Sequence, residues 1–341
     1  MQILKDTGRK TYFIITVDTE CDKGPGWLIQ KPLKFRSAID GIPSILEPVF
    51  QQFGAKATYL LSPEVIQNDD CVSILRDVQK KGAELGTHLH GEFIEPHTKL
   101  DTDATWEMQN TYSRDIEYQK LKNLTALFEE KFGYRPTSFR AGRFGIGENT
   151  LPILAELGYT VDSSVAPYCS WKDKGGFIEF FGAPTQPYHP DATNPKKKGK
   201  LPILEVPVTV GKTWYEYIPK SLLNSVPKYP RLWSIPQIIF KEQFKPIFLR
   251  PTFQLGTFEN MKSLILSQIK KNQPHDVFLV MLVHNVDFVP GCSPYAQTES
   301  ESQKFLNRLS DILRFVQSIP VKFITLSEVR NCFQNNPQQC P

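Results

Sequence analysis

Residues 11–22, TYFIITVDTECD, join a short apolar run to two acidic residues. The apolar part is rich in β-branched and aromatic residues, which predicts a buried β-strand. Asp18 and Glu20 stand two positions apart at its end, and two such side chains point the same way on a strand. A single acid in this place most often forms a turn or caps a helix, so the rest of the chain must decide what this pair does.

Strand-like and helix-like segments alternate along the chain that follows. Further strands are predicted at 56–61, 83–90, 136–145, 159–165, 201–210, 276–285 and 321–326. Helices are predicted at 38–54, 71–82, 103–132, 148–158, 300–319 and 327–333. Repeated strand–helix units indicate an α/β protein with a parallel sheet and right-handed crossovers. In such folds the chemistry gathers at the carboxyl ends of the strands.

Length and composition limit the classes of function. A chain of 341 residues fits one large α/β barrel or two ordinary domains. The net charge of +4 is mild and gives no reason to expect a nucleic acid partner. The six cysteines are scattered without a CxxC pair, and the first apolar run is too short for a signal peptide. No stretch is apolar enough to span a bilayer, and we expect a cytoplasmic chain with reduced thiols.

Two regions interrupt the alternation. We expect one domain, residues 8–341, with a hairpin or loop insertion at about 168–200 and an aromatic, basic insertion at about 213–257. The second insertion and the KKKGK tip of the first suggest contact with a membrane surface or an anionic lipid-linked sugar. The alternative is a loop packed over the barrel mouth with solvated lysines. The lack of a continuous amphipathic helix favours that alternative.

Reactive side chains collect where the predicted strands end. They are Asp18 and Glu20, His88 and His90, Arg140, Asp162, and His284. Complementary chemistry at five separate strand ends is hard to explain by turn-forming residues alone. The sequence therefore predicts an active site at one end of the sheet.

The spacing of the two histidines suggests a metal site. His88 and His90 are two apart on a strand, so both imidazoles reach one point. Two histidines and one carboxylate commonly bind zinc or another divalent ion and leave positions open for water and substrate. Glu92 lies four residues after His88 and is an alternative ligand to His90.

The remaining polar residues then have separate tasks. One acid of the first pair binds the metal, and the other takes a proton from the attacking water. Arg140 holds that base, unless it merely pairs on the surface with Glu148 or Asp162. His284 protonates the leaving group, and Asp162 behind it fixes its tautomer and raises its pKa.

The order of these motifs resembles that of the polysaccharide deacetylase family, which includes chitooligosaccharide and peptidoglycan deacetylases. The matching stretches are TVDTE (16–20), GTHLH (86–90), FRAGRFG (139–145), VDSSV (161–165) and MLVH (281–284). HNVDFVPGCSPY and FRAGRFGIGENTLPILAELGY are similar to a subgroup encoded with bacterial surface-polysaccharide genes. The resemblance implies a distorted (β/α) barrel of about seven parallel strands with helices outside. It also implies a divalent metal, with zinc expected and cobalt or nickel as alternatives, and hydrolysis of an N-acetylated carbohydrate.

The resemblance also implies a role for each strand-end residue. The catalytic group would be Asp18 as base, His284 as acid, Arg140 orienting the base and Asp162 tuning the acid; the metal ligands would be Glu20, His88 and His90.

Two departures from the family pattern leave alternatives open. The family's first motif has adjacent aspartates and its second has histidines four apart, whereas both pairs here are two apart, so Asp18 and Glu20 are allowed to exchange roles. Arg143 is an added cation that either binds an anionic substrate group or pairs on the surface. The competing functions are a carbohydrate-binding protein of the same fold and a deformylase of a lipid- or nucleotide-linked sugar.

Overall fold

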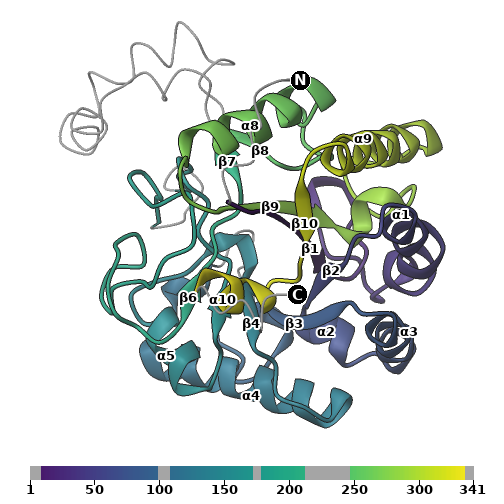
Figure 1. The fold of residues 1–341 in the computed structure, drawn as a ribbon. Coiled ribbons are helices and arrows are strands. Elements are labelled where there is room, and N and C mark those ends of the chain that lie inside the picture. Colours follow the sequence, from purple (N-terminus) through teal and green to yellow (C-terminus); the bar gives the residue numbers. More distant parts are fainter. Residues whose placement is uncertain (1–8, 99–107, 172–177, 212–245, 335–341) are drawn as a thin grey trace, which may run out of the picture.

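Eight parallel strands form the centre of the protein, and helices lie along most of the outside (Figure 1). The computed structural model describes residues 9–98, 108–171, 178–211 and 246–334. The sheet strands are β1 (Thr11–Thr19), β2 (Ala57–Leu61), β3 (Glu84–Leu89), β4 (Ser138–Ala141), β5 (Val161–Asp162), β6 (Leu204–Glu205), β9 (Val277–His284) and β10 (Val321–Phe323). Their order is β10-β1-β2-β3-β4-β5-β6, with β9 on β1. This confirms the predicted α/β fold and its distorted barrel.

Strand β1 organises the sheet. It pairs with β9 along Thr11–Asp18, with β10 along its first residues and with β2 along its second half. All nine of its residues are buried, as expected for a parallel strand covered on both faces. Because Asp18 is in register with His284 at the end of β9, the pairing alone brings two of the predicted site residues side by side.

The helices pack outside the sheet and follow the predicted alternation. They are α1 (Glu47–Gln52), α2 (Pro63–Ile66), α3 (Asp69–Lys80), α4 (Arg114–Phe132), α5 (Thr150–Glu156), α8 (Phe258–Lys271), α9 (Glu299–Gln317) and α10 (Glu328–Phe333), and the π-helix η2 (Ser37–Leu46) precedes α1. Helix α4 begins later than predicted, after the N-cap Ser113, whose side chain accepts from the backbone of Ile116; part of the predicted 103–132 helix lies outside the described residues.

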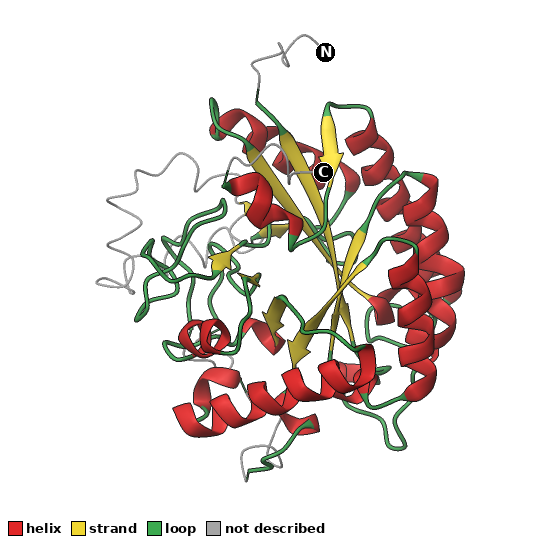
Figure 2. Cartoon of the chain, turned by 60° about the horizontal axis from the view of Figure 1, so that its bottom comes forward, coloured by secondary structure: helices red, strands yellow, loops and turns green. Residues whose placement is uncertain are grey.

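One side of the barrel is built from loops instead of helices (Figure 2). After β6 the chain runs along β9: the backbone N–H of Thr209 donates to the carbonyl of Val280 at 3.0 Å, and its hydroxyl accepts from the amide of Val280 at 2.8 Å. These contacts join the segment after β6 to β9, although β6 and β9 are not paired as strands. Helix α10 covers the end of the barrel at which the strands begin, where Arg330 donates to the carbonyl of Pro202 at 3.1 Å.

The two predicted insertions are described only in part. Isolated antiparallel bridges join Ser170 to Glu179 and Pro190 to Lys198 in the first, and 172–177 lies outside the described residues. Most of the second, 212–245, also lies outside them. Its described end carries β8 (Ile247–Phe248), which pairs antiparallel with β7 (Val210–Gly211).

The cysteines and the described helices test two expectations from the sequence, reduced thiols and the lack of a membrane span. Four cysteines are free thiols, but Cys332 is disulfide-bonded, so the expectation of reduced thiols is wrong at that residue. None of the described helices has both the length and the hydropathy that a membrane span requires.

Candidate active site

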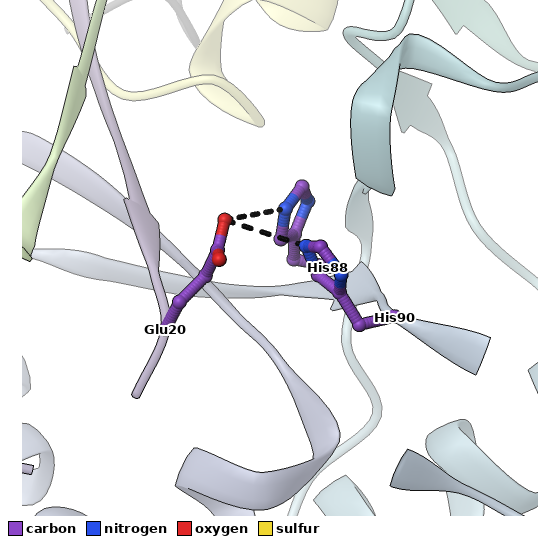
Figure 3. Close-up of side chains that lie close together, drawn as sticks. All are labelled: Glu20, His88 and His90. Atoms are coloured by element: carbon purple, nitrogen blue, oxygen red, sulfur yellow. Dashed lines mark ion pairs between the residues drawn. The ribbon is translucent and has the colours of Figure 1, made fainter. Parts of the chain in front are cut away.

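Three buried side chains at the ends of β1 and β3, which are separated by β2, converge on one point (Figure 3). Glu20 follows β1, His88 lies on β3 and His90 follows it. The Oε1 atom of Glu20 is 3.5 Å from Nε2 of His88 and 3.3 Å from Nε2 of His90. The three ligand atoms lie within 4.8 Å of one another. Glu20, and not Asp18 or Glu92, completes this group.

The hydrogen bonds of the two imidazoles fix which nitrogen faces the cluster. Nδ1 of His88 lies 2.9 Å from the carbonyl of Arg140, so Nδ1 carries the proton and Nε2 presents a lone pair to Glu20. Nδ1 of His90 lies 3.4 Å from Oε1 of Glu92, which favours the same tautomer. Burial disfavours the charged imidazole, but Glu20 and Glu92 raise the pKa of His90 to about 9 in the metal-free protein.

This donor set fits a divalent metal. Lone pairs on two nitrogens and one oxygen repel each other unless a cation lies between them. A proton on His90 supplies only part of the positive charge that is needed. Two imidazoles and a carboxylate are ligands that zinc, cobalt and nickel accept. Nε2 of His90 is also buried without a hydrogen bond among the described residues, as expected of a ligand atom.

Asp18 lies next to this cluster but has its own partner. Its Oδ1 accepts from Nη1 of Arg140 at 2.6 Å. Arg140 is fully buried and its other nitrogens donate to the carbonyl and hydroxyl of Ser163 at 2.8 and 2.9 Å, so it is not a surface residue. Burial raises the pKa of Asp18, but Arg140, His88 and His284 together lower it below its usual range. Asp18 is therefore an ionised carboxylate with one oxygen held.

Two buried residues that the sequence analysis missed hold Glu20. Lys23 is 3% exposed, and its Nζ lies 3.1 Å from Oε2 of Glu20. Asn285 donates to the carbonyl of Glu20 at 2.9 Å and accepts from its amide at the same distance. Burial raises the pKa of Glu20, but His90 and Lys23 bring it well below its usual range. Only the spacing of three between Glu20 and Lys23 hints at this in the sequence.

His284 completes the cluster from β9. Its Nε2 lies 3.7 Å from Oε1 of Glu20 and 3.8 Å from Oδ2 of Asp18. Burial and Arg250 lower its pKa to about 4. The expectation that the pKa of His284 is raised is therefore wrong. The positive charge of Arg250, which pairs with Asp287 at 3.0 Å, disfavours a second positive charge on the imidazole.

The prediction that Asp162 lies behind His284 is wrong. The carboxylate of Asp162 accepts from the hydroxyl of Ser164 at 2.7 Å and from its amide at 3.2 Å. The acidic side chains paired with His284 are Asp18 and Glu20. Asp162 ends β5, which is separated from β1 by three strands in the sheet order, and Nδ1 of His284 has no hydrogen-bond partner among the described residues.

The loop after β4 supports His90 from the other side. Nη2 of Arg143 lies 3.0 Å from Oε1 of Glu92, the oxygen that also faces Nδ1 of His90. Arg143 has a φ of 55°, a left-handed conformation that costs a non-glycine residue energy and often marks functional loops. A Cβ on Gly142 would clash with the carbonyl of Leu89 at 2.5 Å and crowd Nε2 of His90 at 3.2 Å, so the close approach of this loop to β3 requires glycine.

A separate cavity lies at the other end of the barrel. Its volume is about 620 Å³, and Arg9, His275, Phe278 and Phe333 are among its lining residues. Arg9 precedes β1, His275 and Phe278 lie at the start of β9, and Phe333 ends α10, so the cavity is at the amino ends of the strands. None of the predicted site residues lines this cavity. The cluster of Glu20, His88 and His90 lies at the opposite end, where the strands finish.

Comparison with known proteins shows the fold. No protein-family model and no curated protein sequence matches the chain. Among solved structures, a protein assigned as a polysaccharide deacetylase from Mycobacterium smegmatis is 13% identical with a TM-score of 0.53, over 97% of this chain and 93% of its own. One similarly assigned from Pseudomonas aeruginosa PAO1 is 14% identical with a TM-score of 0.52, over 96% and 92%.

A third structure shows that the fold is shared across differently named proteins. Puue allantoinase is 14% identical with a TM-score of 0.54, over 96% of this chain and 91% of its own. At such identity a likeness establishes the barrel alone. The chemistry has to be argued from the residues at the strand ends.

Proposed function

We propose that this protein is a metal-dependent hydrolase that removes the acetyl group from an N-acetylated sugar of a polysaccharide or its precursor. The observation that carries the proposal is the convergence of Glu20, His88 and His90, with the ionised Asp18 and His284 beside them. Three protein ligands with neighbouring proton-transfer groups suit a catalytic metal better than a structural one. The shared fold with solved polysaccharide deacetylases supports this class.

The site residues divide the work by their contacts. A divalent ion held by Glu20, His88 and His90, which we expect to be zinc, would polarise an amide carbonyl and lower the pKa of a water molecule. Asp18 is the base: Arg140 holds its Oδ1, which leaves Oδ2 to accept the proton of the attacking water.

His284 is the acid that protonates the departing amine. Its lowered pKa keeps the ring neutral at rest, so it must first receive the proton that it donates. Oδ2 of Asp18, 3.8 Å from Nε2 of His284, is the near source of that proton. The base and the acid thus act in sequence on the same proton.

The mouth of the site suits a sugar. Trp27 packs with its ring centroid 5.5 Å from that of His284 and 5.3 Å from that of Tyr295, which is 40% exposed. Aromatic faces bind the apolar faces of sugar rings, and polar tips remain for hydroxyl groups. We assign Arg143, whose side chain is 23% exposed, to contact with an anionic substrate group.

Product analysis tests the proposal. Purified protein loaded with zinc, cobalt or nickel is incubated with N-acetylated and N-formylated hexosamine oligosaccharides, and the released acid and free amine are measured. We expect acetate release that a chelator abolishes and added metal restores. Formate release with no acetate would make the protein a deformylase. Protein that holds one metal ion per chain and releases neither acid would refute the hydrolase and favour a carbohydrate-binding role.

A further inference from the structure

A second pair of buried acids lies on the barrel strands away from the metal cluster. Asp162 and Glu205 are direct register partners on the parallel strands β5 and β6. Both residues are fully buried. Register partners on adjacent parallel strands carry their side chains on the same face, so the two carboxyl groups are neighbours. Two neighbouring carboxyl groups bond to each other only if one of them carries a proton.

The hydrogen bonds around the pair leave one oxygen for that proton. Both oxygens of Asp162 accept from Ser164. Oε1 of Glu205 accepts from the amide of Val165 at 3.0 Å. Oε2 of Glu205 is buried and has no donor among the described residues, so a proton placed there turns an unsatisfied acceptor into a donor towards Asp162.

No positive charge among the described neighbours balances two negative charges here. Arg140 is the nearby cation, and its nitrogens already contact Asp18 and Ser163. Tyr188 faces the pair from the loop before β6, but its hydroxyl donates to the carbonyl of Pro195. An uncompensated buried charge is costly, and carboxyl groups in such surroundings keep their proton.

We propose that Asp162 and Glu205 share a single proton at neutral pH and act together as positioning residues for Arg140. Ser164 links the pair to β4, because its hydroxyl donates to Asp162 and accepts from the amide of Ala141 at 2.9 Å. The neighbouring Ser163 receives two hydrogen bonds from Arg140. The acid pair therefore fixes the segment on which Arg140 rests, and Arg140 in turn fixes Asp18.

The direction of the pKa changes agrees with this geometry. Burial, followed by the charge of Asp162, holds the pKa of Glu205 well above its usual range. Burial also raises the pKa of Asp162. Proton sharing stands on these contacts alone, whereas the positioning role rests on the proposed function of Asp18.

Proton release on unfolding tests the shared proton. The proposal requires that the folded protein keep the shared proton at pH 8, so unfolding at that pH frees one proton, and the equilibrium constant for folding falls tenfold per pH unit between the unfolded and folded pKa values. Calorimetric unfolding in buffers of different ionisation enthalpy counts the protons released. We expect the Glu205→Gln variant to release one proton fewer than the wild type at pH 8.

A matched variant shows whether the proton release is specific to Glu205 or common to buried glutamates. Glu117 is also buried, and burial raises its pKa only to about 6. It is therefore ionised at pH 8 in both states, and Glu117→Gln should release as many protons as the wild type. Equal proton release by wild type and Glu205→Gln would overturn the shared proton.

An infrared measurement covers the case in which Glu205→Gln does not fold. The wild type should show the carbonyl stretch of a protonated carboxyl group at pH 8, and Asp162→Asn should shift or remove it. A wild-type spectrum without this band would overturn the proposal.

Kinetics test the positioning role. Glu205→Ala should lower kcat with little change in KM. Glu205→Gln, whose amide still donates to Asp162, should restore kcat. Equal loss in both variants would refute positioning. If no deacetylation is found in any variant, the proton counts still decide the first half of the proposal.

Discussion

Two pairs of buried acids lie on this barrel, and their surroundings give them opposite chemistry. Asp18 and Glu20 each have a cation: Arg140 binds the first and Lys23 the second. Asp162 and Glu205 have backbone amides, a serine hydroxyl and each other. The first pair therefore stays ionised and suits a metal and a proton transfer, whereas the second pair is expected to keep a proton.

The comparison shows that burial does not decide the charge of a carboxyl group. All four residues are at most 4% exposed, so their cost of desolvation is similar. The charged partner within hydrogen-bond reach makes the difference. Removing the cation beside Asp18 or Glu20 should therefore change activity or stability in a way that no substitution around Asp162 and Glu205 reproduces.

The largest effect is expected from Asp18→Asn. The amide oxygen still accepts from Arg140, but the side chain no longer takes a proton, so turnover should fall by about 10²–10⁴-fold. Metal content should remain that of the wild type, which elemental analysis of the purified protein checks. Glu117→Gln, a change at a buried carboxyl away from the cluster, serves as the control and should keep its turnover. An active, metal-loaded Asp18→Asn variant would show that another residue is the base.

The next effect concerns Lys23. Lys23→Met leaves the buried Glu20 carboxylate with His90 as its remaining cation, and the metal-free protein should lose up to about 3–5 kcal/mol of unfolding free energy. Added zinc should recover part of that loss, because the ion replaces the missing charge. Denaturant unfolding with chelator and with zinc measures both values.

An exposed ion pair provides the control for Lys23. Lys80 and Asp77 are also three residues apart and lie 2.8 Å from each other, with side chains 76% and 60% exposed. Lys80→Met should leave the unfolding free energy close to that of the wild type, because solvent screens this pair. A similarly small loss for Lys23→Met would mean that Glu20 does not depend on its cation.

The smallest effect is expected from Glu92→Gln. Glu92 orients His90 without joining the ligand atoms, and loss of such a partner typically weakens metal affinity about 10–100-fold. Competition with a chelator of known affinity measures the change. Glu95→Gln is the matched control, because Glu95 pairs with the exposed His97 at 3.5 Å. Complete loss of metal binding would make Glu92 itself a ligand.

The metal cluster could be predicted from the sequence because its members follow a strand rule. His88 and His90 are two apart at the end of β3, and Glu20 follows a strand whose residues are all buried. The side-chain period of a strand places such residues on one face whatever the rest of the fold does. Arg140 could be named for the same reason, since it also ends a strand.

The partners of these residues could not be predicted. Arg140 and Asp18 are 122 residues apart, and Glu205 is in an apolar run that gave no sign of a partner on β5. Lys23 lies beyond the end of β1 in a short irregular segment, where no periodicity indicates the direction of a side chain. The assignment of Asp162 to His284 failed because both end a strand, and sequence does not show which strand ends face each other.

The sequence by itself determined that this chain forms an α/β barrel and which side chains stand at the ends of its strands, since apolar periodicity and strand geometry are local properties. The tertiary structure alone decided which of those side chains meet. The order of strands around the barrel places His284 beside Asp18 and Glu205 beside Asp162. Charge and proton affinity depend on those neighbours, because electrostatic interactions act across space and not along the chain.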